Sequence, residues 1–467
     1  MAADWRLALY HRMPAWMQDA AASVRGWQLE RWRYGAETDW LVEEAQERES
    51  WTAERWKSWQ EERLARLLDR AAKRVPYYRA MWAERRVRGD KGSWERLENW
   101  PVLEKEEVRR QPEAFLAEDC DPRRMFETHT SGTSGTPLKL WQSRRTLREW
   151  YALFEARWRR WHGVSRRDRW AILGGQLVVP VERREPPFWV HNRPMRQLYL
   201  SSYHLGPDFV PSYVEELRRF RPVYLWGYSS ALCTLAQECI RLGVRDLRYR
   251  VVLTNAEPLF GFQREAMEKA FDAPVRETYG MSEMAAAAGE CEEGRMHWFP
   301  DAGVVEVLDA DESGAGDLVA TGLMNGDMPL IRYRVGDRVK PAAPGARCEC
   351  GRGLPLLDRI EGRLDDVIVT PDGRRVGRMD PVFKADLSIR EAQIVQEEVD
   401  LVLVRVVPGV EFGERQKEEL KQRVRLRLGE QVRVEVERVK EIERTANGKF
   451  RAVVSKIGAG KGFNAQP

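Results

Sequence analysis

The sequence predicts an α/β fold in which a large N-terminal domain opens with helices and a small α+β domain follows at the C-terminus. Residues 1–100 carry apolar side chains at helical spacing, and from about 125 to 340 short β-rich runs alternate with helical patterns. The last hundred residues have longer β-rich runs around one charged helix. A chain of 467 residues also exceeds the usual size of a single hydrophobic core, which favours two or more domains.

The opening segment, residues 1–100, is rich in Trp, Arg and Glu, and the stretch ERWKSWQEERLARLLDRAAKRV predicts an amphipathic helix. Eleven of the nineteen tryptophans lie in this segment, at positions 5, 16, 27, 32, 40, 51, 56, 59, 82, 94 and 100. One interpretation is a face for a membrane surface or a partner, and the other is a helical layer packed on the main body. Interspersed acidic and basic residues favour the packed layer.

The central region predicts a layered α/β domain. Its expected strands are the runs WAILGG, VYLWGYS, RYRVVLTNAE and GDLVATGL, and its expected helices are YVEELRRFRP, SSALCTLAQECIRLG and GFQREAMEKAF. Ligands of such folds bind in loops at the carboxyl ends of the strands, so we expect the functional loops there.

The C-terminal region changes character. AQIVQEEVDLVLVRVVPG and VRVEVERVKEI predict strands on either side of the charged helix FGERQKEELKQRVRLRLGE. The polar, turn-rich stretch GRLDDVIVTPDGRRVG lies between this unit and the central region. We therefore expect an N-terminal domain over residues 1–361, a C-terminal domain over residues 362–467, and a hinge near residues 363–366.

Composition narrows the classes of function. The chain has 77 Lys+Arg against 73 Asp+Glu, so its overall charge recommends neither nucleic acid nor an anionic membrane as the main partner, and small anionic ligands remain open. The sequence has no apolar run long enough to span a bilayer and no plain signal peptide, which makes a cytoplasmic location the default expectation. Six cysteines are too few for a disulfide scaffold of this size and agree with a reducing compartment.

The stretch HTSGTSGTPLKL, residues 129–140, is a candidate phosphate cradle. Two glycines among five hydroxyl residues let backbone N–H groups turn toward one anion, and Lys139 adds a positive charge. Its spacing differs from the GxxxxGK[ST] nucleotide loop, and a Gly/Ser/Thr stretch taken alone is more often a flexible loop. The density of donors and the closing Pro137 favour phosphate binding here.

A second candidate stands near the end of the chain, in ERTANGKFRAV, residues 443–453. Asn447 and Gly448 form a strong turn signal that places Lys449 in a loop between strand-like runs. Taken alone, such a lysine is most simply an exposed hairpin residue.

Six motifs occur together in the order and approximate spacing of the adenylate-forming superfamily: TSGTSGTP, NAEP (255–258), YGMSE (279–283), YRVGD (333–337), GRLDD (362–366) and TANGK (445–449). Within this superfamily the chain resembles the phenylacetate–coenzyme A ligase branch, and most closely its CapK relatives. VPYYR (75–79), PPFWVHNRPMRQLYLSSYHL (186–205), CECGRGLP (348–355) and NGKFRAVVS (447–455) extend the resemblance over most of the chain. An ordered set of motifs is far more specific than any one of them.

The resemblance implies a nucleotide site. The Ser/Thr/Gly loop would bind the β- and γ-phosphates of ATP, the NAEP segment would flank adenine, and the YGMSE turn would stack on the base and hold the α-phosphate. The residues that inherit these roles are Ser131, Gly132, Thr133, Ser134, Gly135, Thr136, Lys139, Ala256, Glu257, Pro258, Tyr279, Gly280, Met281 and Ser282. Lys139 departs from the commonest pattern by one position, because Leu138 intervenes.

The resemblance also implies catalytic roles for charged residues. Glu283 would ligate Mg²⁺, Asp337 would accept hydrogen bonds from the ribose, Arg363 would reach the ribose–phosphate, and Asp365 would lie at the pivot between domains. Lys449 would be the lysine that a moving C-terminal domain brings to the adenylation site. Without the resemblance, Asp337 is a plain turn aspartate and Arg363 with Asp365 a surface ion pair.

A metal site is the third candidate. Cys348 and Cys350 can present two thiolates from one turn, and Cys291 with His297 could complete a tetrahedral Cys₃His set for structural Zn²⁺. Free buried cysteines are an equally good interpretation of the pattern alone. Members of the family branch have zinc at a corresponding cluster, which favours the metal.

We expect the acyl pocket near WGYSS (226–230) and the small residues after Glu283, with Trp226, Tyr228, His204 and Ala285 as its candidate residues. Packing in the core is an equal use for the two aromatic side chains. The resemblance favours an aryl acid as substrate and coenzyme A as acceptor, with a carrier protein, an amine or a hydroxyl as alternatives. A homodimer is compatible with the sequence. A third interpretation is a non-catalytic membrane or protein-interaction module, which the intact Glu283, Asp337, Arg363 and Lys449 disfavour.

Overall fold

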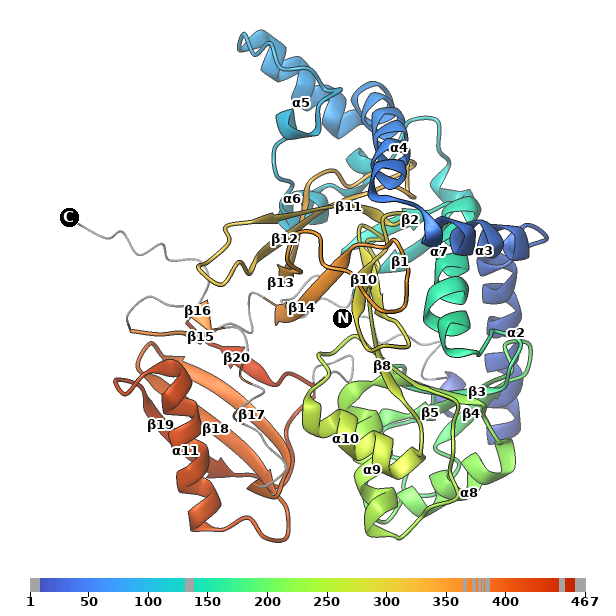
Figure 1. Ribbon diagram of the computed structural model, residues 1–467. Helices are drawn as coiled ribbons and strands as arrows, with labels where there is room; N and C mark the ends of the chain where they lie inside the picture. The colour runs from blue at the N-terminus through green and yellow to red at the C-terminus, as the bar shows by residue number, and fades with distance from the viewer. Residues whose placement is uncertain are drawn as a thin grey trace.

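The computed structural model describes residues 9–130, 138–363, 368–371, 375–376, 379, 382, 387–444 and 450–457, without the side chains of residues 363, 375–376 and 426–427. Figure 1 shows a large N-terminal domain, coloured blue to orange, and a small C-terminal domain, coloured orange to red, beside its lower part. The large α/β domain and the small C-terminal domain confirm the predicted fold class.

The opening segment is helical, as predicted. It comprises α2 (Ala15–Arg33), α3 (Thr38–Glu47), α4 (Ala53–Arg74) and α5 (Pro76–Val87). Thr52 caps α4 by accepting a hydrogen bond from the backbone N–H of Arg55, and the valine–proline step at Pro76 ends α4 and starts α5. The cores of the large domain bury Trp56, Trp82 and Trp100, which supports the packed layer. On α2 and α3, Trp16, Trp27 and Trp40 remain exposed.

Twelve strands of the described residues form one sheet in the order β11-β12-β13-β14-β10-β9-β8-β7-β6-β3-β5-β4. From β5 to β8 the neighbouring strands are parallel, and the strands from β8 to β11 are antiparallel. The parallel part and its edge consist of β3 (Trp170–Gly174), β4 (Trp189–Asn192), β5 (Gln197–Ser201), β6 (Tyr224–Tyr228), β7 (Val252–Asn255) and β8 (Val275–Gly280). The antiparallel part consists of β9 (Ala287–Glu290), β10 (Met296–Trp298), β11 (Gly303–Leu308), β12 (Gly316–Gly322), β13 (Tyr333–Pro341) and β14 (Leu356–Arg363).

Helices α8 (Val210–Phe220), α9 (Ser229–Arg241) and α10 (Gly261–Phe271) connect the parallel strands and pack on them. These strands are rich in Val, Leu, Trp and Tyr on both faces because the sheet is covered on both sides. The loops after β6, β7 and β8 therefore meet at one edge of the sheet, where we expected the functional loops.

A hairpin and a long helix complete the large domain next to that edge. Strands β1 (Phe126–His129) and β2 (Lys139–Gln142) pair antiparallel on either side of the Ser/Thr/Gly segment, and α6 (Lys105–Arg110) precedes them. Helix α7 (Arg144–Leu153) starts at a Ser143 cap and continues into a π-helical stretch, Phe154–Arg159. Such π-helical turns occur frequently at functional sites.

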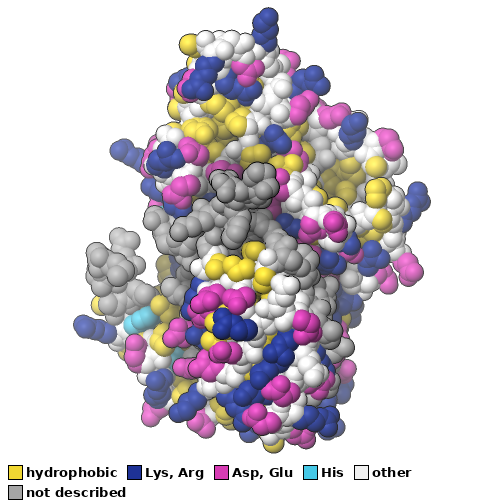
Figure 2. All heavy atoms as spheres, turned by 90° about the vertical axis from the view of Figure 1, so that its left-hand side faces the viewer, with side chains coloured by type: hydrophobic (Ala, Val, Ile, Leu, Met, Phe, Trp, Pro, Cys, Tyr) yellow, Lys and Arg dark blue, Asp and Glu magenta, His cyan; other side chains and the backbone are white. Residues whose placement is uncertain are grey.

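The C-terminal domain has a four-stranded sheet in the order β19-β18-β17-β20, with α11 (Glu414–Leu428) on one face. The strands are β17 (Ile389–Glu398), β18 (Leu401–Pro408), β19 (Arg433–Arg438) and β20 (Val453–Ser455), and the short pair β15 (Ile368–Val369) and β16 (Arg375–Val376) precedes them. Alternate residues of β18, including Val402, Val404 and Val406, are buried against α11. On the face in Figure 2, basic and acidic side chains are interspersed, in agreement with the near-balanced charge of the chain.

No helix in the described parts of the chain combines the length and the apolar character that a membrane crossing needs.

Candidate active site

A cavity of about 500 Å³ lies at the carboxyl ends of the parallel strands. Its lining comes from α2, the β1–β2 hairpin, α7 and the segments that follow β7 and β8. Phe450 and Arg451 of the C-terminal domain also line it, so both domains build the cavity. The predicted NAEP and YGMSE segments lie together here, although Asn255 and Tyr279 are 24 positions apart in the sequence.

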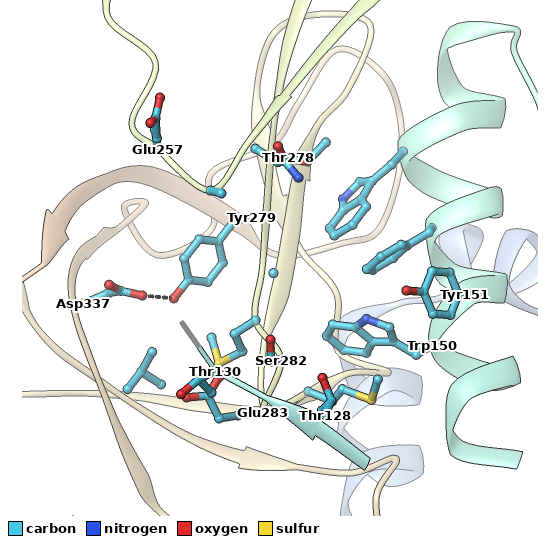
Figure 3. Close-up of a pocket in the computed structure, with 18 of the residues that line it drawn as sticks. Thr128, Thr130, Trp150, Tyr151, Glu257, Thr278, Tyr279, Ser282, Glu283 and Asp337 are labelled. Atoms are coloured by element: carbon cyan, nitrogen blue, oxygen red, sulfur yellow. Dashed lines mark hydrogen bonds between the residues drawn. The ribbon is translucent and has the colours of Figure 1, made fainter. Parts of the chain in front are cut away.

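One wall is polar and contains Tyr279 and Asp337. The hydroxyl of Tyr279, at the end of β8, donates a hydrogen bond of 2.6 Å to Oδ2 of Asp337 on β13 (Figure 3). In the β13–β14 pair, Asp337 is the direct partner of Arg363, so the backbone register brings two predicted site residues side by side. A planar aromatic ring beside a carboxylate suits a base and its ribose hydroxyls.

The turn after β8 presents Ser282 and Glu283. Gln142 of β2 donates a hydrogen bond of 2.9 Å to the carbonyl oxygen of Ser282 and so ties the turn to the hairpin. Oε1 of Glu283 lies 3.1 Å from Nζ of Lys105 and accepts a bond of 3.0 Å from the Tyr333 hydroxyl. The Glu283 side chain is only 7% exposed, so these partners offset the cost of burying its charge.

Lys105 is a candidate that sequence reasoning missed. It begins α6, lines the cavity and brings a positive charge next to Glu283. An isolated lysine in LEKEEVRR has the pattern of an ordinary solvated helix end, and only the packing of α6 against the turn distinguishes it.

The opposite wall is aromatic and was missed as well. In Figure 3, Trp150 and Tyr151 of α7 stand across the cavity from Tyr279 and Asp337. The full set of aromatic residues on this side is Trp32, Phe126, Trp150, Tyr151, Phe154, Trp158 and the predicted Trp226. The helical spacing in REWYALFEARW carried a signal for this face, because residues 150, 154 and 158 recur every four positions.

Gly280 connects the two walls. A Cβ atom built at Gly280 would lie 2.8 Å from the indole of Trp158, closer than such contacts allow. Glycine is therefore required in the YGMSE turn by the close approach of the aromatic wall, in addition to any contact with a ligand.

The NAEP segment forms a tight turn after β7. Ala256 has φ of 64°, a backbone conformation that costs energy for a residue with a Cβ and is frequent at functional sites. The turn directs Glu257 inward, where one carboxylate oxygen accepts a 3.0 Å bond from the backbone N–H of Ser230 and the other accepts one from the backbone N–H of Phe450. Burial raises the pKa of Glu257, and these N–H donors act in the opposite direction.

Glu277 is a second carboxyl group of the cavity. Burial, and then the charge of Glu290, raise the pKa of Glu277 to about 8, while Arg264 acts in the opposite direction. Its side chain borders the cavity next to the NAEP turn. A carboxyl group that keeps its proton near neutral pH can donate a hydrogen bond as well as accept one.

Replacement of Glu277 by glutamine should change the pH dependence of stability. The folded-state pKa of about 8 lies above the ordinary glutamate value of 4.5, so the folded protein favours the protonated form and loses stability as pH rises from 4.5 to about 8. We expect the melting temperature of the wild type to fall by roughly 1–3 °C relative to Glu277→Gln between pH 5 and pH 8.5. Calorimetric scans across this range measure the effect, and a difference that does not vary with pH would contradict it.

The predicted Cys/His cluster assembles from the end of β9, strand β10 and the loop before β14. The ligand atoms of Cys291, His297, Cys348 and Cys350 all lie within 4.8 Å of one another. Sγ of Cys291 is 3.6 Å from Sγ of Cys348, and Sγ of Cys350 is 3.5 Å from Nε2 of His297. Around a tetrahedral Zn²⁺ the S···S and S···N separations would be about 3.7 Å and about 3.5 Å, so the spacing fits this ion.

The orientation of His297 fits as well. Its Nδ1 lies 3.2 Å from the carbonyl oxygen of Leu354, so an Nδ1–H donor leaves the lone pair of Nε2 directed at the cysteines. Arg352, from the cysteine loop, pairs with Glu49 of the opening segment at 3.0 Å and with Glu292 at 2.7 Å. The cluster is thus connected to the helical opening as well as to the sheet.

The chain is similar in sequence to several known proteins. Residues 368–456 match the family model of the CapK C-terminal domain. Protein CapK of Staphylococcus aureus is 23% identical over 463 residues, which cover 96% of this chain and 99% of that protein. Over nearly its whole length the chain is therefore similar to a CapK protein. The phenylacetate–coenzyme A ligase of Thermus thermophilus is 28% identical over 67% of this chain and 71% of its own length.

The fold of this CapK-like chain is that of adenylate-forming ligases. A crystal structure of 2-hydroxyisobutyryl-CoA ligase in the postadenylation state, in complex with 2-HIB-AMP, matches 88% of this chain and 91% of its own chain with a TM-score of 0.65 at 21% identity. The sequence-based resemblance and fold class are both confirmed.

In this CapK-like chain four predicted site residues lie away from the cavity. His204 is buried in another core, where its Nδ1 is hydrogen-bonded to the Ser201 hydroxyl at 2.8 Å and its ring stacks on Phe188. Tyr228 and Ala285 do not line the cavity either. Tyr228 directly precedes α9, and Ala285 is fully buried in the core. Lys139 pairs with Glu127 at 3.2 Å, on the face of the hairpin opposite to the cavity-lining Thr128.

Eight predicted site residues lie outside the described residues: Ser131, Gly132, Thr133, Ser134, Gly135, Thr136, Asp365 and Lys449. Arg363 is described by its backbone alone.

Proposed function

We propose that the chain is an ATP-dependent ligase that activates a carboxylic acid as an acyl-adenylate and then transfers the acyl group to an acceptor. The observation that carries this proposal is a single cavity with two kinds of wall. Tyr279, Asp337 and the Ser282–Glu283 turn form a side suited to a nucleotide, and an aromatic side suited to an organic acid faces it.

In the first step, an oxygen of the substrate carboxylate attacks the α-phosphorus of ATP. A P–O bond forms, the bond to the β-phosphate breaks, and pyrophosphate leaves. Tyr279 would lie against adenine, Asp337 would accept the ribose hydroxyls, and Ser282 would donate to the α-phosphate. The step is governed by positioning and by neutralisation of negative charge, and no protein nucleophile is needed.

Glu283 fits the role of a Mg²⁺ ligand. Its carboxylate is anchored by Tyr333 and lies at the junction of the two walls, and one carboxylate with phosphate oxygens suits this ion. Mg²⁺ would supply charge neutralisation on the phosphates. Lys105 adds a second positive charge beside Glu283.

In the second step, a nucleophile attacks the carbonyl carbon of the acyl-adenylate, the C–O bond of the mixed anhydride breaks, and AMP leaves. We assign Lys449 and Arg363 to charge stabilisation in the first step, and Asp365 to the pivot about which the C-terminal domain, residues 362–467, turns between the steps.

We propose an aryl acid as the substrate. The aromatic residues of α7 and its π-helical extension give a flat, apolar surface, and Trp158 is held edge-to-face by Trp226 with ring centroids 5.8 Å apart. Aromatic walls favour flat rings because offset and edge contacts add to the burial of apolar surface. The phenylacetate–coenzyme A ligases among the relatives support the same class.

Coenzyme A is the first candidate acceptor, and a carrier protein, an amine or a hydroxyl is the second. The similarity to CapK extends over 96% of the chain, whereas that to the phenylacetate ligase of Thermus thermophilus extends over 67%. The match to a CapK-type C-terminal domain supports keeping the second candidate, because this domain takes part in the transfer step of the proposed mechanism.

We also propose that the Cys/His cluster holds a structural Zn²⁺. Four protein ligands fill a tetrahedral ion and leave no position for substrate.

Pyrophosphate exchange into ATP tests the function. We expect exchange with one or more acids from a panel of aryl and aliphatic carboxylic acids, with aryl acids exchanging faster. Addition of coenzyme A, hydroxylamine or a phosphopantetheinylated carrier protein then identifies the acceptor by mass spectrometry of the product. If a folded protein shows no exchange with any acid of the panel, the non-catalytic interpretation is favoured.

A further inference from the structure

The carboxylate of Glu257 links the two domains. It belongs to the NAEP turn of the large domain, and its Oε1 accepts a hydrogen bond from the backbone N–H of Phe450 in the C-terminal domain. The side chain is 8% exposed. A buried carboxylate needs hydrogen-bond donors to offset the loss of water, and one of the two donors to Glu257 belongs to the other domain.

The large domain also holds the Glu257 carboxylate by a contact of its own. Oε2 accepts a 3.0 Å bond from the backbone N–H of Ser230, in the first turn of α9. The positive end of a helix stabilises an anion, so Glu257 is fixed in the turn with its second oxygen directed at Phe450 of the C-terminal domain. The strained Ala256 immediately before it sets that direction.

The C-terminal domain holds the backbone around Phe450, whose N–H is the donor, by contacts of its own. The carbonyl oxygen of Arg451 accepts a 2.9 Å bond from Gln393, and Val453 pairs with Ile394 where β20 joins β17. The guanidinium of Arg444 lies 4.8 Å from the centre of the Phe450 ring. The N–H of Phe450 is therefore a fixed point of the small domain.

Phe450 directly follows Lys449 in the chain. We propose that Glu257 is a positioning residue that holds the C-terminal domain in the arrangement required for acyl-adenylate formation, through its hydrogen bond with the N–H of Phe450. This inference rests on the proposed function, because it gives Lys449 its role in the first step. The bond must break when the domain turns for the second step, so this contact matters for one half-reaction only.

Two further contacts between the described parts of the domains lie away from Glu257. Arg390 of β17 pairs with Glu238 of α9 at 3.0 Å, but the arginine is 43% exposed. Phe262 of α10 packs against the core of the small domain. Arg390→Ala is therefore a matched control, since it removes an interdomain contact away from the cavity and leaves Glu238 paired with Arg241 at 2.7 Å.

Hydrogen–deuterium exchange tests the contact without any substrate. In Glu257→Ala, we expect the amide of Phe450 to exchange about tenfold faster or more, while the amides of Val453 and Val454 in β20 keep their protection. Arg390→Ala should leave the Phe450 amide within about twofold of wild type. Equal protection of Phe450 in the wild type and in Glu257→Ala would overturn the proposal.

The two half-reactions give the functional readout. Pyrophosphate exchange should fall about 10- to 100-fold in Glu257→Ala, and this loss should exceed the loss in transfer from a supplied acyl-adenylate by about tenfold, because an adenine contact would serve both steps and the Phe450 contact only the first. Glu257→Gln keeps the size and one acceptor oxygen, so its loss should be intermediate. Equal losses in both half-reactions, in variants whose melting temperatures match the wild type, would overturn the proposal. A wild type that exchanges with no acid would refute the proposed function, and amide exchange would still decide whether Glu257 holds Phe450.

Discussion

Lys449→Ala is expected to lower acyl-adenylate formation about 10³-fold and to leave the transfer of a supplied acyl-adenylate within about threefold of wild type. The attack of a carboxylate on the α-phosphorus brings two negative groups together, and a positioned ammonium lowers the energy of that transition state. In the second step the nucleophile and the leaving group change, and the C-terminal domain is expected to have turned away. Pyrophosphate exchange and single-turnover transfer measure the two steps separately.

Lys456→Ala is the matched control for Lys449→Ala. Lys456 belongs to the same domain, is 52% exposed and pairs with Glu397, so its loss removes one charge without affecting the cavity. Both half-reactions should stay near wild type in this variant. If Lys449→Ala loses both half-reactions to the same extent, the lysine is not specific to adenylation and the assignment is wrong.

Loss of the Cys/His cluster should have the largest effect on stability. In Cys350→Ser we expect zinc content to fall from about one ion per chain to near zero and the melting temperature to fall by roughly 10 °C or more. The cluster joins the end of β9, strand β10 and the loop before β14, and Arg352 extends the connection to Glu49. Without the ion, the variant would hold two thiols, a hydroxyl and an imidazole close together with no shared partner.

Cys120→Ser is the control for Cys350→Ser. Cys120 lies outside the cluster, where its thiol faces Asp327 at 3.4 Å, and its replacement should change neither the zinc content nor the melting temperature by a comparable amount. Elemental analysis of purified protein and thermal unfolding with and without a chelator measure both quantities. A wild-type protein that is fully folded and free of zinc would contradict the metal assignment.

The sequence determined the architecture because its patterns are local. Runs such as VYLWGYS and RYRVVLTNAE became β6 and β7, and the charged segment after residue 413 became α11, since alternation and helical spacing do not depend on distant residues. The motifs also identified Tyr279, Glu283 and Asp337, which all line the cavity. Tyr279 lies at the end of β8 and Glu283 in the turn after it, where ligand loops of such sheets are expected, whereas Asp337 lies within β13 and contacts the Tyr279 hydroxyl.

Packing between distant segments decided the rest of the site. His204, Tyr228 and Ala285 follow plausible motifs, yet their side chains turn into other cores or away from the cavity. Lys105, Trp150 and Trp158 lie in segments that read as ordinary helices, and only the docking of α6 and α7 against the YGMSE turn makes them part of the cavity. Neighbouring residues of the β1–β2 hairpin point to opposite faces, and the register places Lys139 on the face away from the cavity.

The sequence by itself therefore determined the fold class, the ordered motifs and the ligand types of the Cys/His cluster, because these depend on residue identity and local spacing. Only the tertiary structure decided which aromatic residues face Tyr279 and Asp337 across the cavity, and that Glu257 accepts a hydrogen bond from the N–H of Phe450. Both depend on packing between segments that are distant in the sequence, and the Glu257–Phe450 contact joins residues 193 positions apart in two domains, which no local pattern encodes.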